Sequence, residues 1–201
     1  LSLVGSEMCI RDRNNVDCQT FLVVVNFMAE GFSRMDGSAD DISIPALVDY
    51  LRQAHIYFLD YCLPAIRRKL IEAIDCSQDD VSFLILKFFD GYMREVRKHM
   101  EYEEKTVFKY VDTLIHGNAP KNYQISTFSK HHDQVGERLT ELKNIIIKYC
   151  PAKANTNVLN AALFDIYACE EGLESHCKVE DYLFVPAILK LERSCLLYTS
   201  P

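Results

Sequence analysis

The sequence predicts an all-α protein, an antiparallel up-down-up-down four-helix bundle. Four long segments carry apolar residues at alternating steps of three and four, the spacing of a helix face that is buried in a core. The connections between these segments are short, which forces consecutive helices to run antiparallel. Alternation with the period of a strand is nowhere sustained, so no sheet is expected.

The expected helices are separated by residues that end helices. The four helices cover residues 45–74, 78–115, 124–149 and 155–192. Pro45 suits the first helical turn, because the amide hydrogen that proline lacks has no partner there. Turn-forming Asp, Ser, Gly, Asn and Pro residues occur in the interruptions at 75–77, 117–120 and 150–151.

A further helix is expected ahead of the bundle, at residues 18–30. A linker rich in Gly, Ser and Asp follows at 31–41. We interpret residues 14–44 as the truncated remnant of a small N-terminal helical domain, and residues 45–194 as the bundle.

Both ends of the chain resemble translated sequencing adapter, in the runs LVGSEMCIRDR at 3–13 and CLLYTSP at 195–201. We therefore expect residues 1–13 and 195–201 to be foreign to the natural protein. The cysteines that remain form no CxxC pair: Cys18, Cys62, Cys76, Cys150, Cys169 and Cys177. They are expected to be reduced thiols in a cytoplasmic protein.

The composition limits the classes of partner. A chain of 201 residues with 49% hydrophobic and 25% charged residues can bury one sizeable core. Its net charge of -7 is spread over all segments, which argues against nucleic acid, because phosphates demand a basic face. Charges interrupt every apolar stretch before it reaches the roughly 20 residues of a membrane-spanning helix. We expect a soluble protein without a nucleic-acid or membrane partner.

Every expected helix turns at least one histidine toward the core. The first and third helices contribute one histidine each, and the second and fourth contribute a histidine followed four residues later by a glutamate. On the second helix the same inward row includes Val81, Phe88 and Tyr92. At about 1.5 Å of rise per residue, the four histidines lie roughly 26 to 32 Å from the same bundle end. The six residues of this layer are His55, His99, Glu103, His132, His176 and Glu180.

This set of side chains predicts a metal site. Imidazole nitrogens and carboxylate oxygens together suit iron, manganese or zinc. Four histidines and two glutamates exceed what one tetrahedral zinc needs. Two metal ions bridged by both carboxylates would use all six, and we favour two iron ions, with manganese or zinc able to occupy the same ligands. Without coordination, six unpaired polar groups buried in one layer would cost several kcal/mol each.

The remaining candidates fit ordinary structural roles. Two histidines fall off the inward rows and are expected to be exposed: His116 and His131. Four glutamates are expected to face solvent: Glu101, Glu104, Glu170 and Glu171. Three tyrosines fit core packing better than hydrogen bonding to metal ligands: Tyr57, Tyr92 and Tyr110. No glycine-rich phosphate loop, GxSxG motif or Ser/His/Asp arrangement supports a nucleotide-binding or hydrolase function.

The motifs that contain these residues are HMEYEEKTVF at 99–108, KHHDQVGERL at 130–139 and HCKVEDYLFVP at 176–186, with an LP pair at 63–64. In these motifs the chain resembles hemerythrin-like (HHE cation-binding) domains over about residues 45–192. Among them it is most similar to the di-iron proteins of iron-sulfur cluster repair. Oxygen-carrying hemerythrins place an HxxxH pair on the third helix, but the position four residues after His132 is Gly136. This difference favours the ligand set of the repair proteins over that of an oxygen carrier.

The resemblance implies a non-haem protein that holds two iron ions with an oxo or hydroxo bridge. Such a protein restores iron-sulfur clusters under nitrosative or oxidative stress, and is more a metal-binding stress protein than a turnover enzyme. The expected partners are damaged iron-sulfur proteins or the diatomic ligands oxygen and nitric oxide, and a homodimer is compatible with this role. Residues 14–27 resemble the last helix of the small cysteine-containing domain that precedes the bundle in repair proteins.

Two alternatives stay open. One is a sensing or reservoir module for oxygen, nitric oxide or iron that has no repair activity. The other is a purely structural bundle that carries no stoichiometric metal.

Overall fold

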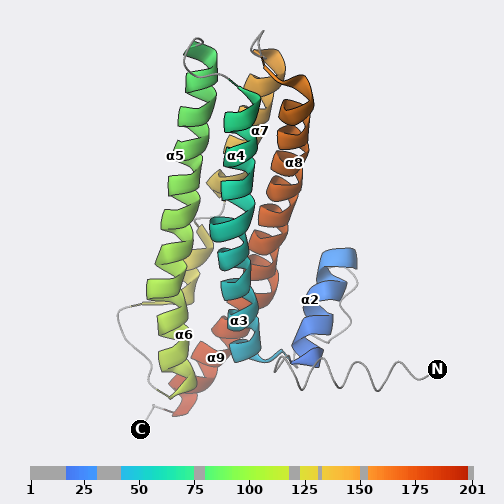
Figure 1. Ribbon diagram of the computed structural model, residues 1–201. Helices are drawn as coiled ribbons and strands as arrows, with labels where there is room; N and C mark the ends of the chain where they lie inside the picture. Colours follow the sequence, from blue (N-terminus) through green and yellow to red (C-terminus); the bar gives the residue numbers. More distant parts are fainter. Residues whose placement is uncertain are drawn as a thin grey trace, which may run out of the picture.

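The computed structural model describes residues 17–30, 42–74, 80–117, 123–130, 133–149 and 154–198. Within these ranges the chain forms helices and no β-strand, which confirms the prediction of an all-α fold. The helices pack side by side as long rods (Figure 1). None of the described helices is both long enough and apolar enough to cross a bilayer.

Three of the rods consist of two α-helices joined without a break by a π-helical segment. The first rod contains α3 (Ile44–Ile56), the π-helical segment Tyr57–Cys62 and α4 (Leu63–Ala73). The second contains α5 (Asp80–Tyr102), the π-helical segment Glu103–Val107 and α6 (Phe108–Ile115). The fourth contains α8 (Thr156–Val179), the π-helical segment Glu180–Phe184 and α9 (Val185–Tyr198). The third contains the 3-10 helix Ile125–Lys130 and α7 (Asp133–Lys148).

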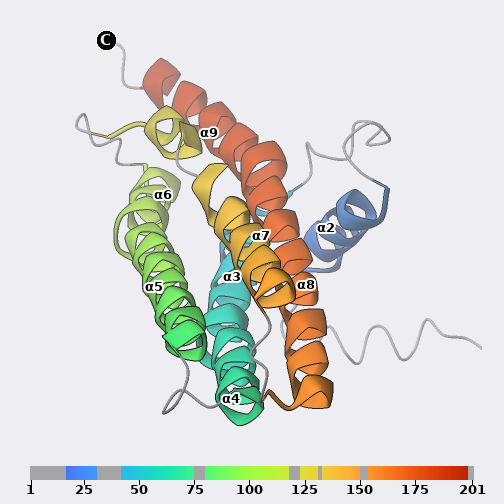
Figure 2. The ribbon, with the colours of Figure 1, turned by 90° about the horizontal axis from the view of Figure 1, so that it is seen from above.

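The rods form a ring around a common core. α4 packs against α5 and α8, and α7 packs against the same two helices from the other side. Figure 2 shows α7 between α5 and α8. The additional helix α2 (Cys18–Glu30) covers the residues expected to be helical and lies outside the ring, against α8 (Figure 2).

Local sequence signals define the starts of the first and fourth rods. The Ser43 side chain accepts a hydrogen bond from the Ala46 amide at 3.4 Å, and proline occupies the first turn of α3. Asn155 caps α8 in the same way, through the Val158 amide at 3.4 Å. The Asn155 amide also donates to the Ala73 carbonyl at 2.8 Å, which ties the start of the fourth rod to the end of the first.

The third and fourth rods differ from the predicted helices at their ends. The helix expected at 124–149 is divided, because the 3-10 helix Ile125–Lys130 precedes α7. That short segment, ISTFSK, is rich in serine and β-branched residues, which are weak helix formers. The fourth rod continues past residue 192 to Tyr198, and the Cys195 thiol donates to the Leu114 carbonyl at 3.7 Å.

The inward row of α5 also differs from the predicted one near its start. Ser82 and Phe89 are fully buried, whereas Val81 and Phe88 are only half-buried. At these two positions the buried residue is the one after the predicted residue, whereas Tyr92, which is 1% exposed, is buried as predicted.

Two apolar clusters form the core, and a polar layer separates them. The first, here called the α4–α8 core, includes Phe58, Tyr92, Met100, Cys169 and Leu173. The second, here called the α3–α9 core, includes Leu51, Val107, Phe108, Val179 and Phe184. On the first, second and fourth rods, buried polar residues lie between the two clusters, as Glu103 does between Met100 and Val107. The fold therefore places a polar layer inside the bundle, with apolar packing on both sides of it.

Two of the π-helical segments precede a proline inside a continuous rod. Pro64 comes two residues after Cys62, and Pro186 comes two residues after Phe184. A proline within an α-helix loses one backbone hydrogen bond, and its ring clashes with the carbonyl four residues earlier. Here those carbonyls belong to residues 60 and 182, which lie inside the π-helical segments. The wider π turn therefore accommodates each proline without ending the rod.

Candidate metal centre

The polar layer brings together four of the six predicted site residues in one buried cluster. One ligand atom from each of His55, Glu103, His176 and Glu180 lies within 4.8 Å of every other. The two histidines are each 3% exposed and the two glutamates are 0% exposed. They come from three rods, so packing of the bundle assembles the cluster.

A fifth predicted residue, His99, joins the cluster through Glu103. The His99 Nε2 atom lies 2.7 Å from Glu103 Oε1, with the two residues four positions apart on the second rod. The side chain of His99 is 14% exposed, more than those of the four residues above. The sixth predicted residue, His132, lies outside the described residues.

π-Helical geometry occurs next to the cluster in all three rods that contribute to it. Glu103 and Glu180 are each the first residue of such a segment, and His55 lies two residues before Tyr57–Cys62. A π turn contains one residue more than an α turn and is frequent at functional sites, because it changes the direction of nearby side chains. Proline accounts for two of these segments, but the segment at Glu103–Val107 has no such local signal.

The Glu103 carboxylate lies between two histidines. Its Oε2 atom is 2.8 Å from His55 Nε2, while its Oε1 atom is 2.7 Å from His99 Nε2. Each oxygen thus faces a different ring. On the fourth rod, His176 Nε2 lies 3.5 Å from Glu180 Oε1. A carboxylate with one oxygen toward each of two imidazoles is suited to being shared by two cations.

The two buried glutamates have opposite pKa shifts. Burial by itself would raise the pKa of Glu103, but the adjacent His55 and His99 outweigh it and lower the pKa to about 2. Glu180 is raised well above its ordinary pKa, mainly by burial and then by the negative charges of Glu103 and Asp181. Without a cation, Glu103 therefore ionises more readily than Glu180.

The donor set fits a metal ion. Both oxygens of Glu103 and the Nε2 atom of His55 are buried, and none of them forms a hydrogen bond of good geometry within the described part of the chain, although the N···O distances are short. Buried polar atoms without such bonds are costly. A cation between the rings and the carboxylates would bind these atoms and remove the repulsion between the two glutamates.

Glu104 has a role that the sequence analysis missed. It was expected to face solvent, but its Oε1 atom lies 3.1 Å from His55 Nδ1, and its Oε2 atom accepts from Arg52 Nε at 3.2 Å. A proton on Nδ1 that is donated to Glu104 leaves the lone pair of Nε2 directed at the cluster. The sequence did contain a signal for this role, because Glu104 directly follows the inward residue Glu103.

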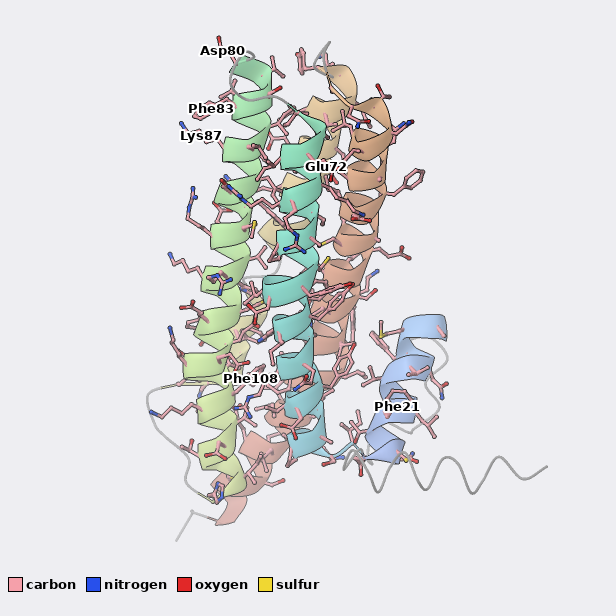
Figure 3. The ribbon with its side chains drawn as sticks, viewed as in Figure 1. Phe21, Glu72, Asp80, Phe83, Lys87 and Phe108 are labelled. Carbon is pink, nitrogen blue, oxygen red and sulfur yellow. The ribbon has the colours of Figure 1, made fainter. Side chains whose placement is uncertain are left out.

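Aromatic rings enclose the histidines. The His55 ring stacks on Phe108 with a centroid distance of 5.5 Å, and Phe108 is labelled in Figure 3. The edge of the His176 ring meets Phe58 at a centroid distance of 6.0 Å. These rings fix the orientation of the imidazoles and keep water from two sides of the cluster, which strengthens electrostatic interactions within it.

For the other residues discussed in the sequence analysis, the structure confirms some of the predicted positions and contradicts others. His116 is exposed, as predicted, while His131 lies outside the described residues. Glu170 does not simply face solvent, because it binds Thr140 and Lys143 on α7. Tyr57 is 51% exposed, so its expected core packing was wrong. Core packing was right for Tyr92 and Tyr110, which are both buried.

The hemerythrin HHE cation-binding domain profile matches residues 46–188, a range that contains all six predicted site residues. The chain belongs to the hemerythrin HHE cation-binding domain family. This match confirms the predicted fold family, and the buried His/Glu cluster of the HHE bundle is its candidate cation site. No curated protein and no solved structure matches the chain.

Proposed function

We propose that the polar layer of this HHE domain holds two iron ions. The ligands would be His55, His99, Glu103, His132, His176 and Glu180. The observation that carries the proposal is the buried cluster, in which four ligand atoms from three rods lie within 4.8 Å of one another. Family membership supports a cation there, and the mixed imidazole and carboxylate donors favour iron, although manganese or zinc could bind the same atoms.

The position of Glu103 supports two ions rather than one. Its oxygens face His55 and His99 separately, and Glu180 supplies a second buried carboxylate. When bound, an iron pair supplies reversible redox chemistry and open positions for small diatomic ligands. The chain's own residues would hold the ions, orient the imidazoles through groups such as Glu104, and exclude water.

Metal analysis of the purified protein tests this proposal. We expect about two iron ions per chain, together with charge-transfer absorption bands of an oxo-bridged pair in the oxidised protein. One metal ion per chain, or zinc as the only stoichiometric metal, would contradict the two-iron centre. A purified protein without stoichiometric metal would support the purely structural bundle instead.

We further propose that the protein serves in the cytoplasm as a repair factor for iron-sulfur proteins damaged by nitrosative or oxidative stress. The resemblance of its HHE motifs to the repair proteins supports this role, and so does Gly136 at the position where oxygen carriers have a histidine. The five cysteines within the described residues are free thiols, which agrees with a reducing compartment.

A recovery assay tests the repair role. An iron-sulfur hydro-lyase inactivated by nitric oxide is incubated with the iron-loaded protein, and the return of its cluster is followed by absorption and activity. We expect faster recovery than with an equal amount of free iron, and no gain with the Glu103→Ala variant. Equal recovery with both proteins, combined with reversible binding of nitric oxide or oxygen, would favour a sensing module instead.

A further inference from the structure

Two cysteines meet inside the bundle about two helical turns from the metal cluster. Cys62 comes seven residues after His55 on the first rod, and Cys169 comes seven residues before His176 on the fourth. Seven residues correspond to about 10 Å along a helix axis. Cys169 belongs to the α4–α8 core, Cys62 packs against that core, and the two thiols lie close enough that each shifts the pKa of the other.

The two thiols differ in access to solvent. Cys62 is half-buried, whereas Cys169 is 2% exposed. The Tyr57 hydroxyl also contacts Cys62, and the Tyr57 ring is 51% exposed, so the pair lies next to the protein surface on the Cys62 side. A small oxidant from solvent would therefore reach Cys62 first.

The surroundings of Cys62 favour its thiolate. The hydrogen bond from Cys169 lowers the pKa of Cys62, burial opposes this, and the hydrogen bond from Tyr57 lowers it again, with a net decrease. The same contact with Cys62, together with burial, raises the pKa of Cys169. One accessible nucleophilic thiol beside one buried protonated thiol is the arrangement of a peroxide-reactive cysteine with a resolving partner.

We propose that Cys62 and Cys169 are a peroxide-reactive thiol pair that forms a disulfide between the first and fourth rods. In the first step the Cys62 thiolate attacks hydrogen peroxide and the O–O bond breaks, which forms Cys62 sulfenic acid and releases hydroxide. This hydroxide takes up the proton that the Cys62 thiol has lost and becomes water. In the second step the Cys169 sulfur attacks the sulfenic sulfur, the S–O bond breaks, and the departing hydroxide takes up the Cys169 proton and leaves as a second water. Two thiols lose two electrons and peroxide gains them.

The disulfide would connect the two rods that carry His55 and His176. It would close a loop of roughly 100 residues, which restricts the unfolded chain strongly. We therefore expect the oxidised protein to unfold at a higher temperature than the reduced protein, by roughly 5 to 15 °C. The pair does not depend on the metal for this chemistry.

Peptide mapping of the intact protein tests the proposal. The purified protein is treated with a small excess of hydrogen peroxide, as isolated and again after removal of metal by a chelator, and digested without reductant. We expect a Cys62–Cys169 linked peptide in both samples, the loss of two thiols per chain, and the rise in unfolding temperature. Bond formation only in the metal-loaded sample, or a linkage between other cysteines, would overturn the proposal.

Variants identify the order of events. Cys169→Ser should leave a Cys62 sulfenic acid that dimedone traps, whereas Cys62→Ser should abolish both the adduct and the disulfide. Tyr57→Phe changes an exposed side chain and should slow the reaction of Cys62 roughly three- to tenfold, because the thiolate loses a hydrogen-bond donor. Cys18→Ser, at another half-buried free cysteine, is the matched control and should react like the unchanged protein. Undiminished disulfide formation in Cys62→Ser would refute the assignment.

Discussion

The Oε1 atom of Glu104 lies 3.1 Å from the Nδ1 atom of His55, on the ring edge opposite to the Nε2 atom that faces Glu103. Arg52 holds the other oxygen of Glu104 from the same rod as His55. This contact orients the imidazole and selects the tautomer in which Nε2 is free to bind a cation. A residue outside the cluster thus orients one of its candidate ligands.

We predict that Glu104→Ala weakens metal binding by about tenfold while the bundle stays folded. The partner of a ligating histidine commonly contributes 10- to 100-fold in affinity, and Glu104 is partly exposed, so the lower value is expected. Competition with a chelator measures the change. Glu101→Ala removes an exposed glutamate of the same rod that pairs with Lys105, and it should leave the affinity unchanged.

Loss of a cluster residue should remove metal. In Glu103→Ala and in His176→Ala we expect well under half of the metal content of the unchanged protein, because each variant deletes a buried ligand atom. His116→Ala, at an exposed histidine, serves as the control. Normal occupancy in both cluster variants would show that the metal binds elsewhere on the chain.

Glu180 should oppose folding when no metal is bound. Its pKa is raised in the folded state, so ionisation costs stability as the pH rises above the ordinary value of 4.5. Glu180→Gln should therefore make the metal-free protein more stable at neutral pH and reduce its metal content at the same time. Urea unfolding between pH 4.5 and 7.5 measures the first effect. Glu174→Gln, at an exposed glutamate of α8, should change neither quantity.

Glu103 should behave in the opposite way. Its pKa is lowered to about 2 in the folded state, so it stabilises the metal-free protein above its ordinary pKa of 4.5, and this contribution is lost as the pH falls toward about 2. In Glu103→Gln, the free energy of unfolding of the metal-free protein should therefore fall less steeply as the pH is lowered. A curve identical to that of the unchanged protein would contradict the inferred charge on Glu103.

The contact between Lys143 and Glu170 should stabilise the packing of α7 against α8. The side chains of Lys143 and Glu170 are 8% and 19% exposed, and the Lys143 ammonium also lies 4.1 Å from the ring centroid of Tyr167. Glu170→Ala leaves a buried charge without its carboxylate and should cost about 2–4 kcal/mol in the free energy of unfolding. Lys143→Met combined with Glu170→Ala should recover most of this loss, because the uncompensated charge is gone.

The sequence determined the helices and the inward histidines and glutamates, because helical periodicity is a local property that can be counted along the chain. The predicted range of α2 agrees with the structure, and His55, Glu103, His176 and Glu180 are buried where their rows placed them. The same counting is uncertain by one position where apolar residues are adjacent. It selected Phe88 where the structure buries Phe89.

Only the tertiary structure decided which side chains meet between rods. Glu104 was assigned to solvent by its position on the helix, yet it contacts His55 across the interface of two rods. The pairing of Cys62 with Cys169 likewise depends on how the first and fourth rods are rotated and shifted against each other. Spacing along one helix contains no information about the rotation of its neighbour. Packing sets that rotation, and with it the contacts that surround the His/Glu cluster.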